Sequence, residues 1–567
     1  AADEHKSHLL LVPSGELQRT VADDAQHTLP NFRQGDAIVL YERNADTDNV
    51  TNKMVFKGNI DYLNENEICI RLRATQQNSS VLPSDSLYAI EHDAMDTTFR
   101  SMYQGLYAFM SATKERRDLL LFQREPQFDV ALDKQIAEAA DDFTRIALKA
   151  KAAKDYFLLV GPPGTGKTSC ALKKMVETFY KEEGAQILLL SYTNRAVDEI
   201  CKALSSIRPE VDFIRVGSEL SCDENYRDHL IENELATCMR RTEVCERINR
   251  CRILVGTVAS ISGKPELFRL KHFDVAIVDE ATQILEPQLL GILCAKGENG
   301  KEGVGKFILI GDHKQLPAVV LQNTEQSEVY DEALSAVGLK NLKDSLFERL
   351  YRTARQHTDA HRTYDMLCRQ GRMHPEVALF ANQAFYEGRL LPVGLPHQLE
   401  DSGNINRLSF YPSQPEPMGS SAKTNHSEAK IAARLAATVY KEHSEAFDAS
   451  RTLGIITPYR SQIALVKKEI EALGIPELNQ ILIDTVERFQ GSERDVIIYS
   501  FCVNYPYQLK FLSNLTEEDG ILIDRKLNVA LTRARKQMLL TGVPTLLERN
   551  PLYKSLLKLI ESLRNIA

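Results

Sequence analysis

The stretch YFLLVGPPGTGKTS, at residues 156–169, joins a short apolar run to a glycine-rich loop. The apolar run is typical of a strand buried in a parallel sheet, and the residues after the loop have the spacing of a helix. The loop matches the pattern G-x-x-x-x-G-K-[ST], whose glycines let backbone N–H groups surround phosphates at the amino end of a helix. The stretch therefore predicts an α/β domain that binds a nucleoside triphosphate.

Four side chains are predicted to handle the phosphates and their metal ion. Lys167 supplies a positive charge to the β- and γ-phosphates, and the Thr168 hydroxyl is a ligand for Mg²⁺. The apolar strand VAIV ends in Asp279 and Glu280, and adjacent carboxylates on a buried strand are costly unless they serve a cation or a proton transfer. We expect Asp279 to hold Mg²⁺ through water and Glu280 to deprotonate the water that attacks ATP. The residues expected to bind ATP are Gly161, Pro162, Gly164, Thr165, Gly166, Lys167, Thr168 and Ser169.

Apolar strands alternate with helical segments over most of the chain. QILLLSY, RILVGT, VAIVDE and KFILIG continue the first series, and LGIITPY, ILIDTV, DVIIYSF and MLLTGV form a second series after residue 369. This alternation predicts two α/β domains with parallel sheets that are buried on both faces. Residues 34–90 instead alternate apolar and polar residues between close turn signals, which is typical of a small β-barrel.

These changes of pattern predict the domains. We expect a β-barrel accessory domain at residues 1–95, a first α/β domain at 96–345 and a second at 346–567. A polar, cysteine-bearing helical stretch at about 218–250 is expected as a small insertion in the first α/β domain. The length of 567 residues fits several domains, because single cores rarely exceed roughly 250–300 residues.

The composition indicates a soluble, intracellular protein, cytoplasmic if the chain is bacterial. No apolar run approaches the roughly 18 residues of a membrane span, so no membrane partner is expected. The ten cysteines include no CxxC pair and no zinc-like spacing, which favours a reducing compartment. A net charge of −9 gives no overall basic field for nucleic acid, but a motor needs cations along one groove only. The start lacks a signal peptide and an initiator Met, so we expect a processed chain or a piece of a longer one.

Six segments follow one another in a set order: VDEATQ, GDHKQLP, RQGRMHPEV, ITPYRSQ, TVERFQGSERDVI and LNVALTRAR. The series resembles the ordered motifs of superfamily 1 helicases. Within them it is most similar to the subgroup of the nonsense-mediated-decay RNA helicase and the nuclease-helicase of Okazaki-fragment processing. The resemblance covers about residues 133–544. It implies two RecA-like domains that hydrolyse ATP in the cleft between them.

The resemblance also implies roles for five further residues. Gln135 reads the adenine edge, which suits an amide that can bond N6 and N7 together, although a surface glutamine on a helix is the alternative. Gln315 senses the γ-phosphate, and Glu493 holds the ribose. Arg372 and Arg533 are the arginine fingers that the second domain offers to the γ-phosphate, rather than members of surface salt bridges.

The nucleic-acid groove is expected to cross both domains. The short polar residues expected against its phosphates are Thr193, Asn194, Thr257, Thr457 and Thr485, each of which could equally be a helix cap or a turn residue. The chain departs from the family at Gly371, where an aromatic residue commonly packs on the nucleotide base. The departure puts base stacking in doubt and leaves the phosphate chemistry untouched.

The resulting hypothesis is an ATP-dependent helicase or translocase that moves 5′-to-3′ on a single strand or a tailed duplex. DNA is favoured over RNA because the nuclease-helicase of the subgroup carries its nuclease upstream, and such a domain is a possible partner missing from this chain. We find no nuclease motif in the chain itself. The alternative is an ATP-switched clamp or remodelling factor that hydrolyses ATP without processive unwinding. The intact phosphate-site residues argue against a non-catalytic binding module.

Overall fold

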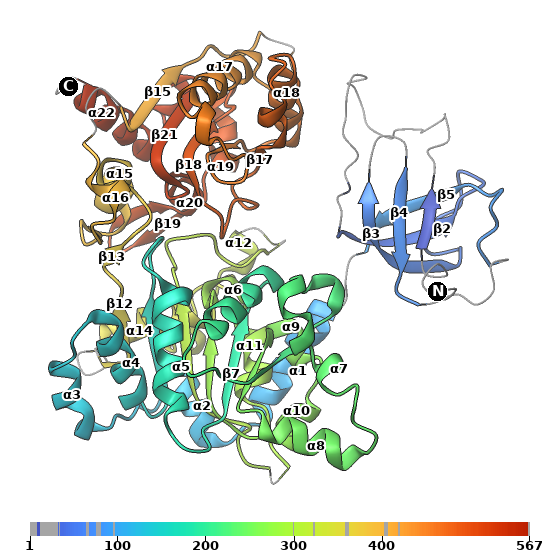
Figure 1. Cartoon of the computed structure of the whole chain (residues 1–567), viewed down its shortest axis with the longest axis vertical. Helices are drawn as coiled ribbons and strands as arrows, with labels where there is room; N and C mark the ends of the chain where they lie inside the picture. Colours follow the sequence, from blue (N-terminus) through green and yellow to red (C-terminus); the bar gives the residue numbers. More distant parts are fainter. Residues whose placement is uncertain are drawn as a thin grey trace. The chain divides into compact units, whose positions relative to one another are not determined.

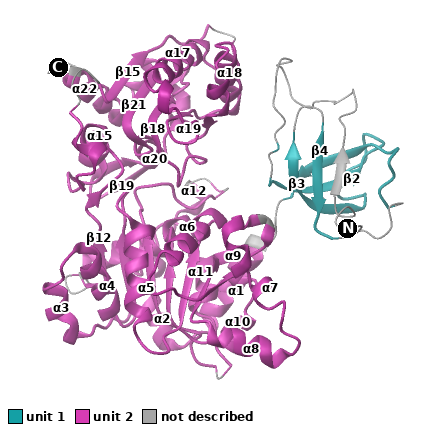
Figure 2. Ribbon diagram, viewed as in Figure 1, with its two compact units in different colours: residues 1–98 teal, residues 99–567 magenta. Residues whose placement is uncertain are grey.

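The chain divides into two compact units, residues 1–98 and residues 99–567 (Figure 2). The computed structural model describes residues 8–11, 32, 35–63, 67–74, 81–93, 97–298, 300–320, 322, 324–357, 362–401, 406–417 and 420–564. What the sequence predicts for residues 1–7 and 12–31 lies outside the described part of the chain.

The first unit contains an antiparallel sheet with the strand order β1-β4-β3-β2-β5. Its strands are β1 (His8–Leu11), β2 (Ala37–Glu42), β3 (Val55–Leu63), β4 (Ile68–Leu72) and β5 (Tyr88–His92). Side chains that alternate along the strands gather on one face, because successive residues of a strand point to opposite sides. The core of this face is Ile38, Leu40, Ile60, Ile70 and Leu72. The antiparallel sheet fits the barrel-like part that the sequence predicts here.

The second unit contains a parallel sheet whose strands β7 and β12 are labelled in Figure 1. The strand order of this sheet is β12-β6-β11-β10-β7-β9-β8. Its strands are β6 (Tyr156–Val160), β7 (Ile187–Ser191), β8 (Phe213–Val216), β9 (Ile253–Thr257), β10 (Phe273–Val278), β11 (Val304–Gly311) and β12 (Tyr364–Met366). Both faces are buried: Phe157 and Leu159 pack on one side, and Tyr156 and Leu158 on the other. The continuous apolar strands of the sequence arise from this double burial.

Helices cover both faces of this sheet. One face packs against α4 (Asp142–Ala152), α5 (Lys173–Tyr180) and α6 (Asn194–Ser205). The other packs against α2 (Lys114–Leu120), α9 (Val258–Ser262), α10 (Glu266–Leu270), α11 (Glu286–Leu293) and α14 (Leu346–Gln356). The remaining helices of this half are α1 (Thr97–Ser111), α3 (Asp133–Ala137), α7 (Ile231–Glu234), α8 (Arg241–Arg250), α12 (Thr324–Ser327) and α13 (Glu332–Ala336). Two of them, α7 and α8, lie between β8 and β9, where the sequence predicts a helical insertion.

A second parallel sheet follows in the order β15-β21-β18-β16-β17. Its strands are β15 (Leu408–Pro412), β16 (Leu453–Ile456), β17 (Leu482–Asp484), β18 (Arg494–Ser500) and β21 (Ala534–Gly542). One face packs against α17 (His426–Glu442) and α18 (Arg460–Glu471), and the other against α15 (Pro375–Phe385), α20 (Arg525–Leu531) and α22 (Pro551–Arg564). The two parallel sheets with helices on both faces confirm the predicted α/β fold class.

Smaller elements complete this half. Residues 515–524 form an antiparallel hairpin, and a short parallel pair joins residues 369–370 to residues 391–392. These elements are β13 (Arg369–Gln370), β14 (Leu391–Pro392), β19 (Leu515–Glu518), β20 (Ile521–Asp524), α16 (Pro396–Leu399), α19 (Leu509–Leu512) and α21 (Pro544–Leu547). The helix α14 and the strand β12 follow residue 345 but pack with the first sheet. The packing therefore favours a boundary after residue 366 over the predicted one after residue 345.

Candidate active site

The sheet brings three predicted motifs to one edge. Gly311 lies opposite Val160 on neighbouring strands, and Val278 lies opposite Leu309. The Gly161 N–H also donates to the Gly311 carbonyl at 2.9 Å. Because parallel strands end at the same edge, the glycine-rich loop, the Asp279–Glu280 pair and the GDHKQLP segment meet there.

The glycines of the loop are required by its backbone. Gly164 and Gly166 have φ values of 73° and 76°, in the left-handed region that glycine adopts without strain. At Gly161, a Cβ atom would lie 2.1 Å from the Lys167 side chain. The loop leads into a π-helical turn at Lys167–Leu172 that continues as α5. This is the strand–loop–helix arrangement that the sequence predicts for binding phosphates.

The predicted metal and proton-transfer groups contact one another. The Thr168 hydroxyl donates to the Asp279 carboxylate at 2.5 Å, and Lys167 Nζ lies 3.5 Å from Glu280 Oε1. Glu280 has a φ of 54°, which is strained for a residue with a side chain and is typical of functional positions. A hydrogen bond of 2.8 Å from Gln283 to Glu280 Oε2 fixes its orientation.

The two carboxyls ionise differently. Burial, with the neighbouring Glu280 charge, raises the pKa of Asp279 to about 6. Burial opposes ionisation of Glu280 as well, but Lys167 and the bond from Gln283 outweigh it and lower its pKa. Asp279 is 1% exposed, so its carboxylate needs a cation, and with the Thr168 hydroxyl it offers the hard oxygen ligands that Mg²⁺ prefers. These residues fit the predicted metal ion.

The two predicted arginine fingers reach this site from the second half. The Gly371 N–H donates to the Gly164 carbonyl at 2.8 Å, and a side chain at Gly164 would meet Arg372 Cβ at 2.4 Å. Arg372 Nε lies 2.5 Å from Glu493, the residue predicted to hold the ribose. Arg372 therefore has a carboxylate partner at the rim of the loop.

Arg533 is buried and has neutral partners. Its guanidinium donates to the backbone carbonyls of Val529 and Ser492 at 3.0 and 3.5 Å and to the Gln315 side chain at 3.2 Å. It is 2% exposed, and no described carboxylate forms an ion pair with it. Burial, together with the Arg372 charge, lowers its pKa to about 9. The charges of Glu280 and Glu493 offset this effect only in part. A buried cation without a directly paired carboxylate is unfavourable, and a phosphate in the loop would supply the missing partner.

A buried polar chain extends from Gln315 into the second half. The Gln315 side chain donates to Asp312 at 2.7 Å, and the Tyr386 hydroxyl donates to the same carboxylate at 2.7 Å. The Asn528 amide donates to the Tyr386 oxygen at 2.8 Å and to the Lys314 carbonyl at 2.6 Å. Sequence reasoning missed Asp312, Tyr386 and Asn528. Asp312 and Asn528 lie inside quoted motifs, whereas Tyr386 follows α15 and belongs to no motif that could have indicated it.

Gln135 lies away from these contacts. It is an exposed residue of α3, and α3 packs on α4. The α4 residue Phe143 approaches the loop, since its ring would lie 3.5 Å from a Cβ atom at Gly166. The predicted adenine contact of Gln135 stays a prediction.

Two of the predicted strand-binding residues cap helices. The hydroxyls of Thr193 and Thr257 accept from the N–H groups of Ala196 and Ser260 at 3.2 and 3.0 Å. Asn194 is the first residue of α6, and the neighbouring Arg195 donates to the Gly491 carbonyl at 3.3 Å. Thr193 and Thr257 are therefore helix caps, which is the alternative role that the sequence left open for them.

Thr457 and Thr485 meet at Asp484. The Thr457 N–H donates to the Asp484 carbonyl at 3.1 Å, and the Thr485 N–H to the Asp484 side chain at 2.8 Å. The Thr457 side chain is fully buried, and its hydroxyl has no hydrogen-bond partner among the described residues. In this conformation its side chain is not accessible to a strand, and the predicted strand contact of Thr457 stays a prediction. Thr485 is half-buried.

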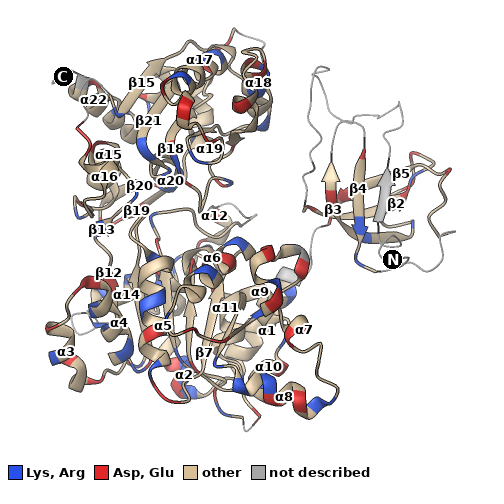
Figure 3. Ribbon diagram, viewed as in Figure 1, with Lys and Arg blue, Asp and Glu red and all other residues tan. Residues whose placement is uncertain are grey.

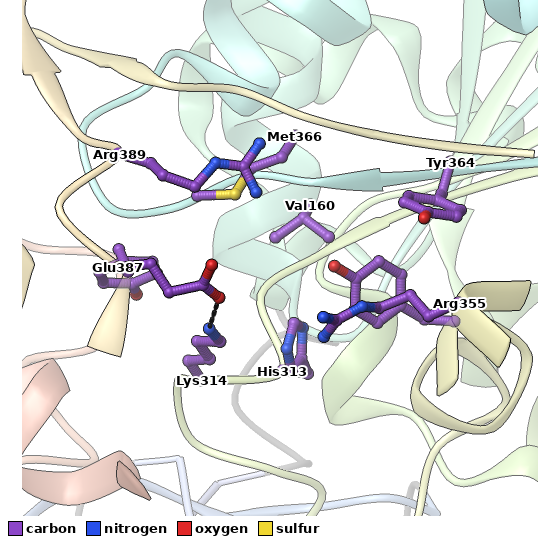
Figure 4. Close-up of a pocket in the computed structure, with 10 residues that line it drawn as sticks. Val160, His313, Lys314, Arg355, Tyr364, Met366, Glu387 and Arg389 are labelled. Atoms are coloured by element: carbon purple, nitrogen blue, oxygen red, sulfur yellow. Dashed lines mark ion pairs between the residues drawn. The ribbon is translucent and has the colours of Figure 1, made fainter. Parts of the chain in front are cut away.

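A cavity of about 170 Å³ lies behind the loop, between the two halves of the second unit (Figure 4). Two of the cations that line it have anionic neighbours: Lys314 lies 3.9 Å from Glu387, and Arg355 pairs with Glu518 at 3.1 Å. Nucleotide-sized pockets measure roughly 300–1,000 Å³. The cavity is therefore smaller than a typical ligand pocket, and the loop is the better candidate for the nucleotide site. Charges of both signs are interspersed over the second unit (Figure 3).

Comparisons with known proteins agree with this geometry. Two family models, each described as "AAA domain", match residues 138–244 and 233–323, and residues 342–545. The "DNA replication ATP-dependent helicase/nuclease DNA2" of Bos taurus is 27% identical over 590 residues, 94% of this chain and 50% of that protein. The Homo sapiens protein of that name is 28% identical over 535 residues, 85% of this chain and 46% of that protein. The "DNA polymerase alpha-associated DNA helicase A" of Saccharomyces cerevisiae is 26% identical over 482 residues, 72% of this chain and 65% of that protein.

The chain belongs to the superfamily 1 helicases. These helicases are ATP-dependent enzymes, and the relatives fit the subgroup that the motif series predicts. The helicase chain spans about half the length of the DNA2 relatives it matches. A solved structure described as "Complex structure of Arterivirus nonstructural protein 10 (helicase) with DNA" covers 70% of this chain and 62% of its own at 16% identity, with a TM-score of 0.35, and adds nothing to the assignment. No helix among the described residues is long and apolar enough to cross a membrane.

Proposed function

We propose that this helicase hydrolyses ATP between its two parallel sheets and uses the cycle to move along single-stranded nucleic acid. The observation that carries the proposal is Arg533, a buried guanidinium that is bonded to Gln315 and has no described carboxylate partner. A γ-phosphate would neutralise it. Binding of ATP would then hold the second half on the loop, and loss of the phosphate would release it.

The residues around the loop divide the chemistry. Lys167 binds the phosphates, and Thr168 and Asp279 hold Mg²⁺, which when bound neutralises charge on the phosphate oxygens. Glu280 accepts the proton of the attacking water, since its low pKa keeps it ionised and its side chain is 26% exposed. Arg533 and Arg372 stabilise the charge of the transition state. Arg372 leaves Glu493 to do so, which frees Glu493 for the ribose, while Gln135 reads the base.

The polar chain from Gln315 through Asp312 to Tyr386 couples hydrolysis to the strand. It joins the residue that senses the γ-phosphate to α15 and α20 of the second half. We place the strand across Asn194 at the start of α6 and Thr485 at the end of β17, with Thr193 and Thr257 fixing the helix starts. The proposed domains are a barrel-like accessory part, a first RecA-like part with its helical insertion, and a second RecA-like part.

The finer points rest on resemblance. The 5′-to-3′ direction comes from the motif series, and the preference for DNA is supported by the names of the relatives, which combine DNA replication with helicase and nuclease. A nuclease that acts alongside this chain belongs to the proposal for the same reason. The expected partner is a single strand or a tailed duplex.

Matched DNA and RNA oligonucleotides test the proposal through ATP turnover. We expect DNA to stimulate hydrolysis more than RNA of the same sequence, and a duplex with a 5′ tail to be unwound in preference to one with a 3′ tail. Stimulated hydrolysis without unwinding would favour the ATP-switched clamp. An ATP turnover rate that no DNA or RNA strand changes would overturn the proposal.

A further inference from the structure

A pair of tyrosines stands on the surface of the second half, directly after β18. The rings of Tyr505 and Tyr507 are stacked, with centroids 5.8 Å apart and planes 12° apart. Tyr507 is 55% exposed, and Phe511, one turn further along, is 65% exposed. Large apolar groups gathered at one exposed place mark a binding surface more often than single exposed residues do.

The turn that carries the tyrosines is braced from below by a buried amide. Gln508 is 2% exposed, and its Oε1 accepts from the N–H groups of Asn504 and Tyr505, both at 2.9 Å. Its Nε2 donates to the Ala422 carbonyl at 2.7 Å and to the Tyr459 hydroxyl at 3.1 Å. All the hydrogen-bonding capacity of this side chain therefore holds the turn in one shape.

A second buried amide adds to the bracing. Asn504 is 6% exposed and donates to the Thr424 carbonyl at 2.7 Å, while its oxygen accepts from Asn425 at 2.9 Å. Exposed turns are usually mobile and do not need two buried amides to fix them. Rigidity is useful where rings must be presented in a set orientation, because little entropy is then lost on binding.

The contact between Gln508 and Tyr459 links this turn to the ITPYRSQ segment. The Thr457 N–H of that segment bonds the carbonyl of Asp484, the neighbour of Thr485, at which the proposed function places the strand. We propose that Tyr505 and Tyr507 form a stacking platform for unpaired bases of the bound strand. The inference rests on the proposed function and names a binding site within it. Every base has a π-face, so such a platform holds a strand irrespective of its sequence.

The net charge of the chain makes this contribution important. A charge of −9 opposes the approach of phosphates at long range. The phosphate contacts themselves weaken as salt rises, because binding releases counterions from the strand. Stacking on a ring is much less sensitive to salt. The platform would therefore keep part of the affinity at salt concentrations that weaken the phosphate contacts.

Strand binding by fluorescence anisotropy tests the platform with the full chain. Tyr507→Ala should weaken binding of an ordinary single strand about tenfold, whereas Tyr507→Phe, which keeps the ring, should bind almost as the wild type does. The matched control is Tyr330→Ala, because Tyr330 is 80% exposed and lies in the first half. We expect this control to leave the affinity unchanged.

A strand with a run of abasic positions separates stacking from every other effect. It retains the phosphates and has no bases to stack, so wild type and Tyr507→Ala should bind it equally. Equal binding of the ordinary strand by both proteins would overturn the platform. A loss that persists on the abasic strand would also overturn it and would point to a contact with the sugar-phosphate backbone or to a structural role of the ring. If the wild type bound neither strand, the proposed function itself would fail.

Discussion

The nucleotide site and the predicted strand groove use their polar side chains differently. In the nucleotide site they contact one another or await a ligand: Thr168 bonds Asp279, Lys167 approaches Glu280, and Arg533 has neutral partners. In the groove, Thr193 and Thr257 bond their own helices. Phosphate chemistry requires particular side chains at set distances, whereas a strand can be gripped by backbone groups and helix ends. Substitutions in the nucleotide site should therefore lower ATP turnover far more than substitutions in the groove lower strand affinity.

The largest effect is expected at Arg533. Arg533→Met keeps the length of the side chain and removes the charge, so turnover should fall by about a thousandfold or more. The nucleotide-free protein should become at least as stable, because a buried cation without a directly paired carboxylate is replaced by an apolar group. Saturating ATPase rates and thermal unfolding without nucleotide measure the two effects. Arg372→Met is the matched control: its ion pair with Glu493 should make it lose stability instead.

Loss of both activity and stability in Arg533→Met would mean that this arginine is structural. Arg372 would then be the only one of the two arginines left with the proposed role at the γ-phosphate. Normal turnover in the variant would remove Arg533 from the site altogether.

Glu280→Gln should have the next largest effect. The substitution preserves the shape of the side chain and removes the base, so turnover should fall about 10²–10⁴-fold while ATP still binds. Lys167→Ala, in contrast, should weaken nucleotide binding itself. Binding of a fluorescent ATP analogue, measured beside steady-state turnover, distinguishes the two. Near-normal hydrolysis by Glu280→Gln with a single strand present would refute its role as the base.

The residues that meet around the glycine-rich loop could be predicted from the sequence because their pattern is local, while their contacts with a nucleotide stay a prediction. The strand–loop–helix context of YFLLVGPPGTGKTS fixes Lys167 and Thr168, and the parallel sheet then brings Asp279 beside them. The burial of Thr457 and the bond between Tyr386 and Asp312 depend on residues distant in sequence. Such contacts between distant residues cannot be predicted from the spacing of residues in the sequence. For the same reason the packing of α14 and β12 on the first sheet was missed.

Tyr386→Phe should have a moderate effect on the coupling between the nucleotide site and the strand groove. The Tyr386 hydroxyl joins Asp312 of the first half to Asn528 of the second, and its loss leaves buried partners unpaired, at a cost of about 1–3 kcal/mol. Basal hydrolysis should persist, because this residue does not contact the loop, while the stimulation by a single strand should fall about tenfold. The ratio of stimulated to basal rate measures it. An unchanged ratio would mean that coupling between the sites runs elsewhere.

The smallest effect is expected at Thr457, where the comparison between the two regions is tested most directly. Its buried hydroxyl has no described hydrogen-bond partner, so Thr457→Val should leave strand affinity unchanged and raise the free energy of unfolding by about 1 kcal/mol. Thr193→Val is the natural contrast, since it removes a helix cap and should cost about 1 kcal/mol. Denaturant unfolding and strand-binding titrations on both variants give the four values needed. If Thr457→Val weakened strand binding without lowering stability, the hydroxyl would have to become exposed when the strand binds. The groove would then be assembled by the strand, unlike the nucleotide site, whose residues already touch one another.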